Sequence, residues 1–297
     1  MTEAGQRGGA ASDADSTRGV TARRIVLGTQ LRRLREQAGM SRADAGYIIR
    51  ASDSKVWRLE LGRVAFKERD VADLLTAFGV TDDGERDAFL DMVRHANEPG
   101  WWRRYNDVTP GWFQDFVGLE ESAARIQTFE LQFVPGLLQI DSYARAIATR
   151  GRPDFTPPDT ERRIGLRMRR QKILAGMNPP TLWAVMDESV LRRPIGGREV
   201  LRRQIEHLLE ASALPNIILQ IIPMHMSGYA AESAFTVLRF AEKELPDVVY
   251  VEHLSGALYL DSRQDIEQYS RAIDRLVVDA ETPDRSRQML AKILSEM

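Results

Sequence analysis

The sequence predicts an α+β protein in which an all-α N-terminal domain precedes a larger α+β domain with a small mixed sheet. Apolar residues between Val20 and Val80 recur with the period of helices rather than of strands. Short apolar runs of strand length follow later, such as Ile217–Ile222, and helical segments lie between them. The 297 residues are enough for about two domains.

The composition excludes several classes of protein. Hydrophobic residues make up 43% and charged residues 28%, as in globular chains rather than disordered or fibrous ones. The chain contains no cysteine, which excludes disulfides, thiolate metal sites and a cysteine nucleophile. No run approaches the ~18 apolar residues of a membrane helix, and the N-terminus lacks the apolar core of a secretory signal. We therefore expect a cytoplasmic protein with no membrane partner.

The domain boundaries follow from changes in composition. Residues 1–20 are rich in Gly, Ala, Ser, Thr and Asp, which predicts a disordered tail. We expect the first domain at 21–97, an aromatic linker at 98–112 and the second domain at 113–297. Residues 22–80 hold twelve basic and seven acidic side chains, whereas the whole chain has a net charge of −2. A basic module on an acidic body predicts a polyanion partner for that module, with chance clustering as the alternative.

The first helix of the N-terminal domain is expected to run to about Gln37. Leu27, Leu31 and Leu34 lie on one face of it, and Gly39 can take the left-handed conformation that ends a helix.

A second helix starts at Ser41, which we expect to form a capping box with Asp44. It ends near Arg50, and Ser52 is expected to cap a third helix that ends before Gly62. Two further helices are expected at about Glu68–Phe78 and around Phe89, Leu90 and Val93.

Two short helices with this spacing resemble the Xre/Cro-type helix-turn-helix family of repressors. The run Leu31–Ser41 resembles the family's first helix and its turn, and Ser52–Gly62 resembles its recognition helix. The family favours Gly where this chain has Arg50, so we expect Arg50 to adopt a positive φ. Ala45-Gly46 and Ala51 also depart from the family pattern, which affects the stability of the module rather than its identity.

The residue types on the third helix indicate DNA binding independently of the resemblance. A recognition helix enters the major groove by its N-terminal end, and here Val56 and Leu59 are expected to face the core. Lys55 and Arg58 can donate to guanine or phosphate, and Arg42 is placed to contact a phosphate. The expected DNA-binding residues are Arg42, Ser52, Asp53, Ser54, Lys55, Trp57 and Arg58.

Alternatives remain open for two of these side chains, and a neighbouring residue is expected to have a structural role. Arg58 could instead form an ion pair with Glu60 or Glu36. Trp57 could pack on a sugar or a thymine methyl group, or could contact a second subunit. Glu60 is expected to be a structural partner for an arginine of the first helix.

The second domain is expected to combine helices with about five strands. The expected helices are 113–128, 142–150, 159–176, 198–212, 265–279 and 283–295; the expected strands are 181–186, 217–222, 234–240, 248–252 and 257–260. The aromatic residues between Trp101 and Phe113 are expected to pack on this domain, with a ligand cage as the alternative. The basic helix 159–176 is either a solvated face that pairs with acids or a site for phosphate, nucleic acid or an acidic partner.

Several runs in the second domain resemble the C-terminal domain of WhiJ-like actinobacterial regulators. These runs are Gly100–Trp102, Trp112–Asp115, Val134–Gln139, Arg192–Gly197, Leu214–Asn216 and Val249–Asp261. The resemblance implies regulation of differentiation or secondary metabolism, and antitoxin-like gene neighbourhoods beside a small partner protein.

The sequence contains candidate residues for a catalytic or metal site, but neither kind of site is expected. Asp187-Glu188 could supply paired carboxylates, although capping of the following helix is favoured. Glu252-His253, Asp261 and His225 could gather a metal, but their spacing matches no metal motif. No nucleophile elbow, phosphate-binding loop or dinucleotide motif is present. We expect no enzyme, no cofactor and no metal.

These observations lead to two hypotheses. The first is a sequence-specific regulator that binds double-stranded DNA at an inverted-repeat operator as a homodimer, and whose second domain receives a small-molecule effector or a protein signal. The alternative is an antitoxin-like protein that binds a small partner protein and autoregulates its own operon.

Overall fold

The computed structural model describes residues 22–62, 64–97, 100–151, 156–226, 231–241 and 245–297. The disordered tail expected at 1–20 lies outside these residues. The chain divides into two compact units, 1–98 and 99–297, which are described separately below. None of the described helices is long and apolar enough to cross a membrane.

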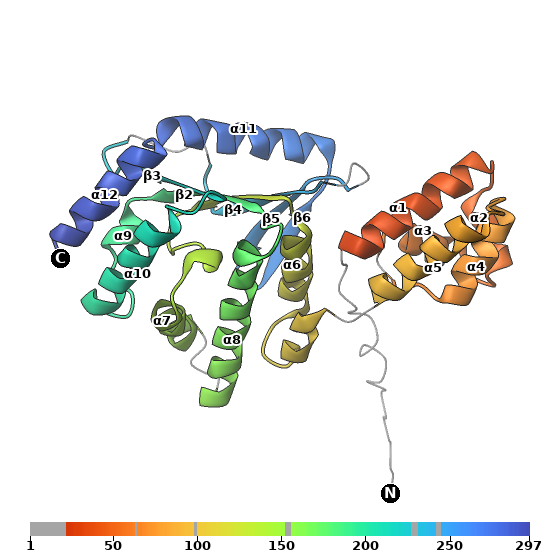
Figure 1. Ribbon diagram of the computed structural model, residues 1–297, viewed down its shortest axis with the longest axis horizontal. Coiled ribbons are helices and arrows are strands. Elements are labelled where there is room, and N and C mark those ends of the chain that lie inside the picture. Colours follow the sequence, from red (N-terminus) through yellow and green to blue (C-terminus); the bar gives the residue numbers. More distant parts are fainter. Residues whose placement is uncertain (1–21, 63, 98–99, 152–155, 227–230, 242–244) are drawn as a thin grey trace, which may run out of the picture. The chain divides into compact units, whose positions relative to one another are not determined.

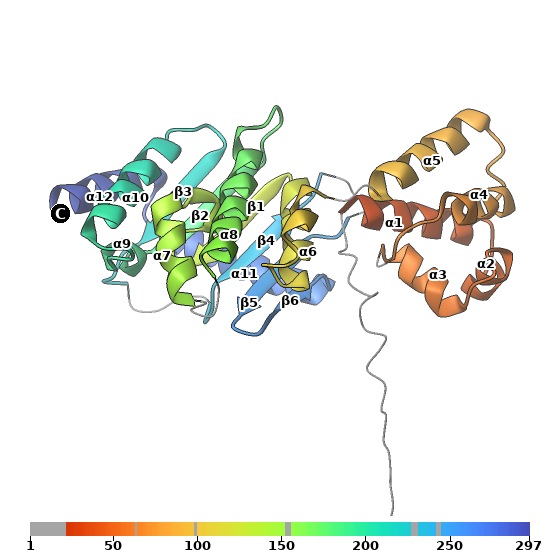
Figure 2. The same ribbon diagram turned by 90° about the horizontal axis from the view of Figure 1, so that it is seen from below.

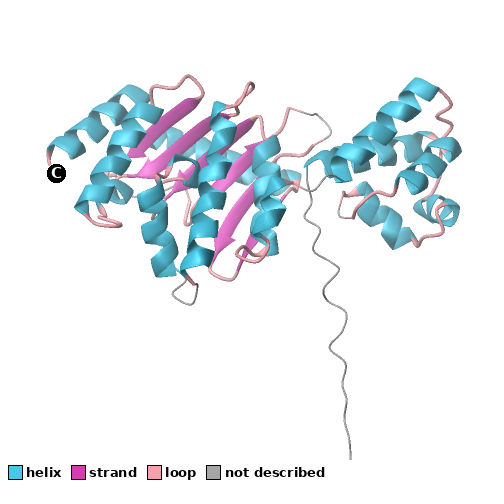
Figure 3. Ribbon diagram, turned by 60° about the horizontal axis from the view of Figure 1, so that its bottom comes forward, coloured by secondary structure: helices cyan, strands magenta, loops and turns pink. Residues whose placement is uncertain are grey.

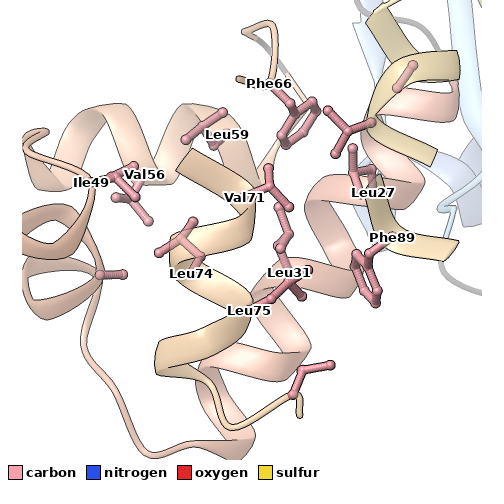
Figure 4. Close-up of a cluster of buried hydrophobic side chains, with 14 residues drawn as sticks. Leu27, Leu31, Ile49, Val56, Leu59, Phe66, Val71, Leu74, Leu75 and Phe89 are labelled. Atoms are coloured by element: carbon pink, nitrogen blue, oxygen red, sulfur yellow. The ribbon is translucent and has the colours of Figure 1, made fainter. Parts of the chain in front are cut away.

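The N-terminal unit is helical throughout its described elements, as the sequence predicts. Its helices are α1 (Ala22–Gln37), α2 (Arg42–Ile48), α3 (Asp53–Glu60), α4 (Glu68–Ala77) and α5 (Asp83–Asn97). Figure 4 shows their shared core, in which Leu27 and Leu31 of α1 lie close to Val71 and Leu75 of α4. Burial of such side chains, each contributing roughly 1.5–3 kcal/mol, stabilises helices of which α2, α3 and α4 are too short to be stable alone.

The caps of α2 and α3 and the turn between these helices confirm the sequence predictions at the level of single residues. Ser41 and Asp44 form the expected capping box, with both bonds at 3.1 Å. Ser52 Oγ accepts the backbone N–H of Lys55 at 3.3 Å and so caps α3. Arg50 has φ 52°, the left-handed value that its position requires.

Backbone packing between α1 and α3 depends on a glycine. A Cβ atom on Gly28 would lie 2.5 Å from the carbonyl oxygen of Leu59 and 2.6 Å from that of Glu60. Since these are backbone atoms that cannot rotate away, only glycine lets α1 lie this close to the C-terminal turn of α3.

The C-terminal unit is built on a mixed six-stranded sheet with the order β3-β2-β1-β4-β5-β6. The strands are β1 (Arg125–Glu130), β2 (Thr181–Asp187), β3 (Ile217–Ile222), β4 (Phe235–Arg239), β5 (Val248–His253) and β6 (Gly256–Leu260). β1, β2 and β3 are parallel, whereas β4, β5 and β6 continue the sheet in antiparallel pairs.

Helices cover both faces of this sheet, as Figures 1, 2 and 3 show. The α-helices are α6 (Gly111–Ser122), α7 (Asp141–Gly151), α8 (Pro157–Arg170), α9 (Ser189–Arg192), α10 (Arg198–Ala211), α11 (Arg263–Asp279) and α12 (Pro283–Ser295), and the 3-10 helices are η1 (Trp101–Tyr105), η2 (Gly136–Leu138) and η3 (Gln171–Ala175). Ile273 and Leu276 of α11 pack on Phe129, Phe235 and Val249 of the sheet. The helices α6, α7 and α8 lie on the opposite face.

Two sequence predictions for this unit are wrong. The helix expected at 113–128 is α6, which ends at Ser122, followed by the unexpected strand β1, so the sheet has six strands rather than five. Four consecutive residues of β1 are buried because helices cover both faces, and such a strand lacks the alternation that would identify it. The helix expected at 159–176 ends at Arg170 and continues as η3. Within the segment expected as a linker, the described residues form η1 and the start of α6.

Candidate nucleic-acid interface

Helix α3 has a buried apolar side and a polar side that faces solvent. Val56 and Leu59 are buried at 2% and 4% exposure, as predicted. The exposed residues of the helix and its cap are Ser52, Asp53, Ser54, Trp57 and Arg58, and Lys55 is half-buried. The N-terminal turn of α3 therefore presents short polar side chains, which can approach base edges closely.

The start of α2 and the polar side of α3 meet in an open hollow. Arg42 Nε lies 3.7 Å from Asp53 Oδ1, and both side chains remain substantially exposed. The hollow has a volume of about 470 Å³ and is lined by Arg32, Arg35, Glu36, Ser41, Arg42, Ala43, Asp53, Trp57, Glu60 and Leu61. Arg42, Asp53 and Trp57 of the expected site are thus brought together.

Lys55 and Arg58 have partners within the N-terminal unit. Lys55 Nζ lies 3.2 Å from Asp70 Oδ2 on α4, so this ammonium group must leave Asp70 before it reaches a base. Arg58 Nε donates to the carbonyl oxygen of Ser54 at 3.3 Å. The alternative in which Arg58 pairs with Glu60 or Glu36 is wrong, because those carboxylates accept from arginines of α1.

Glu60 is a structural residue, as expected. Its carboxylate accepts from Arg35 Nε at 2.5 Å and from Arg35 Nη2 at 3.1 Å, and both residues are buried. Arg35 Nη1 also donates to the carbonyl oxygen of Met40 at 2.7 Å. The hydrogen bond to Glu60 raises the pKa of Arg35, which keeps the pair ionised.

Sequence reasoning missed two exposed residues, one on α1 and one on α2. Arg32 of α1 lines the hollow and pairs with Glu36 at 2.8 Å, and the i, i+4 spacing of the two was the available signal. Tyr47 on the last turn of α2 is 87% exposed.

The C-terminal unit has a separate polar cluster between the sheet and α8. Arg167 Nη1 donates to Gln139 Oε1 at 2.7 Å, and Tyr250 donates its hydroxyl to Glu252 Oε2 at 2.8 Å. The half-buried carboxyl of Glu130 makes no hydrogen bond or ion pair with a described residue. Burial and the nearby carboxylate of Glu252 raise the pKa of Glu130 to about 8, although the positive charge of Arg167 acts in the opposite direction.

Comparison with known families assigns both units. Residues 113–292 match a family described as a domain of unknown function (DUF5753), and this stretch is more than half of the 297 residues. The chain belongs to this family. Residues 26–89 match a helix-turn-helix domain, which supports DNA binding and transcription regulation by the N-terminal unit. No curated protein and no solved structure matches the chain.

The candidate catalytic carboxylates of the DUF5753 domain have structural partners. Asp187 Oδ1 accepts the backbone N–H of Ser189, the first residue of α9, at 2.9 Å, whereas Glu188 is the N-cap residue of that helix and its side chain makes no capping bond. Glu188 pairs with Arg192 at 2.8 Å. Among the described residues, no group of three or more His, Asp or Glu is placed to hold a metal ion.

The aromatic residues at the start of the DUF5753 unit are packed rather than arranged as an open cage. Trp102 and Tyr105 are buried with Val117 of α6 and Leu166 of α8. Trp101 lies edge-on to Trp102, with ring centroids 5.9 Å apart. The packing interpretation of this segment is therefore confirmed.

The raised pKa of Glu130 predicts that the DUF5753 domain loses stability as the pH rises. Between pH 4.5, the ordinary pKa, and about 8, the folded domain holds a proton that the unfolded chain has released. The free energy of unfolding therefore falls as the pH rises across this window. Glu130→Gln is expected to remove the part of this decrease that comes from Glu130. Thermal unfolding at pH 5 and pH 8 checks this. Glu199→Gln, at a side chain 76% exposed on α10, should leave the pH dependence unchanged.

Proposed function

We propose that this protein is a sequence-specific DNA-binding transcription regulator whose helix-turn-helix reads the major groove through α3. The polar N-terminal turn of α3, capped by Ser52 and exposed beside the hollow at Arg42, is the observation that carries this function. The basic charge of residues 22–80 supplies the attraction to phosphate.

Each expected side chain has a role that its position supports. Asp53 and Ser54 lie in the first turn of α3, where they can form hydrogen bonds with base edges. The carboxylate of Asp53 can accept a hydrogen bond from the amino group of cytosine. Arg42 lies 3.7 Å from Asp53 and can hold a phosphate beside the base that Asp53 reads. Trp57 and Arg58 extend the contact by a further turn.

The DUF5753 domain is proposed to join two copies and to receive a signal. One helix-turn-helix contacts too few bases for tight discrimination, so we propose an inverted-repeat operator with half-sites about 34–36 Å apart. The polar cluster of Glu130, Arg167 and Glu252 supports reception of a polar small molecule, because Glu252 is exposed and the half-buried carboxyl of Glu130 has no hydrogen-bond partner among the described residues.

An unbiased genomic selection tests the proposed function. The purified full chain is immobilised, incubated with sheared DNA at near-physiological salt, and the retained DNA is sequenced. Enrichment of a few inverted repeats supports the proposal, whereas retention without sequence preference contradicts it. A stable complex with a co-expressed small partner protein, together with binding only at its own promoter, would favour the antitoxin-like alternative.

Two alanine substitutions test the contacts of α3. Lys55→Ala and Arg58→Ala are each expected to weaken operator binding by about 1–3 kcal/mol, or roughly 5- to 150-fold, if both side chains contact bases. Lys55 should lie at the lower end, because it must first leave Asp70. Gel-shift titration at fixed salt measures the effect.

The control for these variants removes the same charge elsewhere. Arg94→Ala on α5 breaks exposed pairs with Glu68 and Asp91 and should change affinity little. Asp70→Asn frees Lys55 and should maintain or increase affinity. Unchanged binding in both Lys55→Ala and Arg58→Ala would remove these two residues from the interface.

A further inference from the structure

The two edge strands of the sheet in the C-terminal unit, β3 and β6, differ in whether other segments of the chain bond to their outer side. At the β3 edge, the backbone N–H of Ile221 donates to Ser286 Oγ at 3.0 Å, and its carbonyl oxygen accepts from the N–H of Glu281 at 2.9 Å. The start of α12 and the residues before it thus occupy the outer side of β3. This edge is closed to further strands.

The β6 edge is open among the described residues. Strand β6 pairs with β5 on one side, and no backbone hydrogen bond joins its other side to any residue that the structure describes. The hydroxyl of Tyr259 donates to the carbonyl oxygen of Trp112 in α6 and leaves the backbone of the edge open. Its residues, Gly256-Ala257-Leu258-Tyr259-Leu260, carry no charge and no proline, the usual devices that protect an edge strand. Leu258 is 52% exposed, and Leu254 in the adjoining turn is fully exposed.

The residue pattern of β6 is complementary to itself. An antiparallel pair centred on Leu258 places Gly256 opposite Leu260 and Ala257 opposite Tyr259, so that each small residue meets a large one. In the same register Asp261 meets Ser255, and no like charges oppose each other. A two-fold axis through Leu258 generates all these pairs at once, as an isologous dimer requires.

We propose that β6 pairs antiparallel with β6 of a second copy, about a two-fold axis at Leu258, to form one continuous sheet across the dimer. The pairing covers the exposed part of Leu258 and satisfies the open backbone groups of the edge. It rests on the proposed function in one respect, since an inverted-repeat operator requires a two-fold dimer.

Single-cysteine crosslinking is a direct test because the chain has no cysteine of its own. Directly opposed residues of an antiparallel pair have Cα atoms about 4.5–5.5 Å apart, which lies within the range of a disulfide. Full-length Leu258→Cys should form a covalent dimer under mild oxidation. Met177→Cys, at a side chain 99% exposed elsewhere on the unit, should form much less. Equal crosslinking of both variants, or none at position 258, would overturn the proposal.

A charge at the axis gives a second measurement. Leu258→Lys sets two ammonium groups opposite each other and should raise the dimer dissociation constant by about tenfold or more in sedimentation equilibrium. Its melting temperature at low concentration should match the wild type, because Leu258 is half-exposed. A dimer that persists in Leu258→Lys while the wild type still selects an inverted repeat would overturn the β6 contact alone. Crosslinking at position 258 without sequence-specific DNA retention would overturn the proposed function alone.

Discussion

Replacing Glu60 by leucine is expected to lower the free energy of unfolding of the N-terminal unit by about 3–5 kcal/mol. The change leaves the guanidinium group of Arg35 buried without its counter-charge, and such uncompensated charges are strongly destabilising. The pair also joins the end of α1 to the last turn of α3, so its loss releases the helix that carries the proposed DNA contacts.

Hydrogen exchange of the full chain measures this effect for one unit at a time. Amides of α1 and α3 should exchange about two to three and a half orders of magnitude faster in Glu60→Leu, up to the limit set by global unfolding of the unit. Amides of the sheet in the DUF5753 domain provide the internal control and should not change.

A double variant separates the buried charge from simple loss of volume. Arg35→Met with Glu60→Leu removes both charges, and replacing a buried pair by apolar residues of similar size is often neutral. Most of the lost stability should return, apart from the bond that Arg35 gives to the carbonyl oxygen of Met40. If the double variant is as unstable as Glu60→Leu alone, the packing of these side chains and not their charge stabilises the unit.

Local signals explain which parts of the fold could be predicted from the sequence. The caps at Ser41 and Ser52 and the positive φ of Arg50 depend on residues within a few positions of one another, and all three are confirmed. Strand β1 could not be predicted in this way. Helices cover both faces of the sheet, so consecutive residues of β1 are buried. Its sequence therefore lacks the alternation of apolar and polar residues that identifies a strand with one exposed face.

The candidate site shows the same division. The orientation of α3 follows from the apolar spacing of Val56 and Leu59, so the exposed residues of this helix could be identified in advance. The ion pair of Lys55 with Asp70 could not, because it joins residues fifteen positions apart on different helices. DNA contact by the seven expected residues remains a prediction that the alanine variants test.

The basic helix illustrates how tertiary structure decides between two sequence interpretations. Arg162 pairs with Asp107 at 2.7 Å near the surface, which agrees with the interpretation of a helix that pairs with acids. Arg170 pairs too, but it is only 6% exposed, so this part of the helix is not the solvated face that the sequence suggested. Charge alone could not reveal this, because burial of an arginine requires a buried acid that lies far away in the sequence.

The second large effect is expected at that buried pair. Glu120→Leu should lower the free energy of unfolding of the DUF5753 domain by about 3–5 kcal/mol. Glu120 accepts from Arg170 Nε at 2.8 Å and from Arg170 Nη2 at 2.7 Å. Burial alone would lower the pKa of Arg170, but the charge and hydrogen bonds of Glu120 outweigh it and raise the pKa.

Aromatic rings connect Arg170 to the polar cluster around Glu130, so the loss of Glu120 is expected to affect that cluster as well. The guanidinium group lies 4.9 Å from the ring centroid of Phe113 and 5.2 Å from that of Phe116, and Phe116 stacks on Tyr250 at 4.0 Å. Tyr250 in turn donates to Glu252, whose charge helps to raise the pKa of Glu130. Loss of Glu120 is therefore expected to alter the pH dependence of stability as well as its magnitude.

Chemical unfolding of three full-length variants at two pH values tests both parts of this prediction. Arg170→Lys keeps the charge but loses the two-pronged contact, so it should be destabilised, although less than Glu120→Leu. Glu120→Leu with Arg170→Met should regain stability at a given pH, because no charge is left unpaired. If the double variant also keeps the wild-type dependence on pH, the pair stabilises the domain without positioning Tyr250. If it regains stability but loses that dependence, the guanidinium group holds the stacked rings and, through them, the cluster around Glu130.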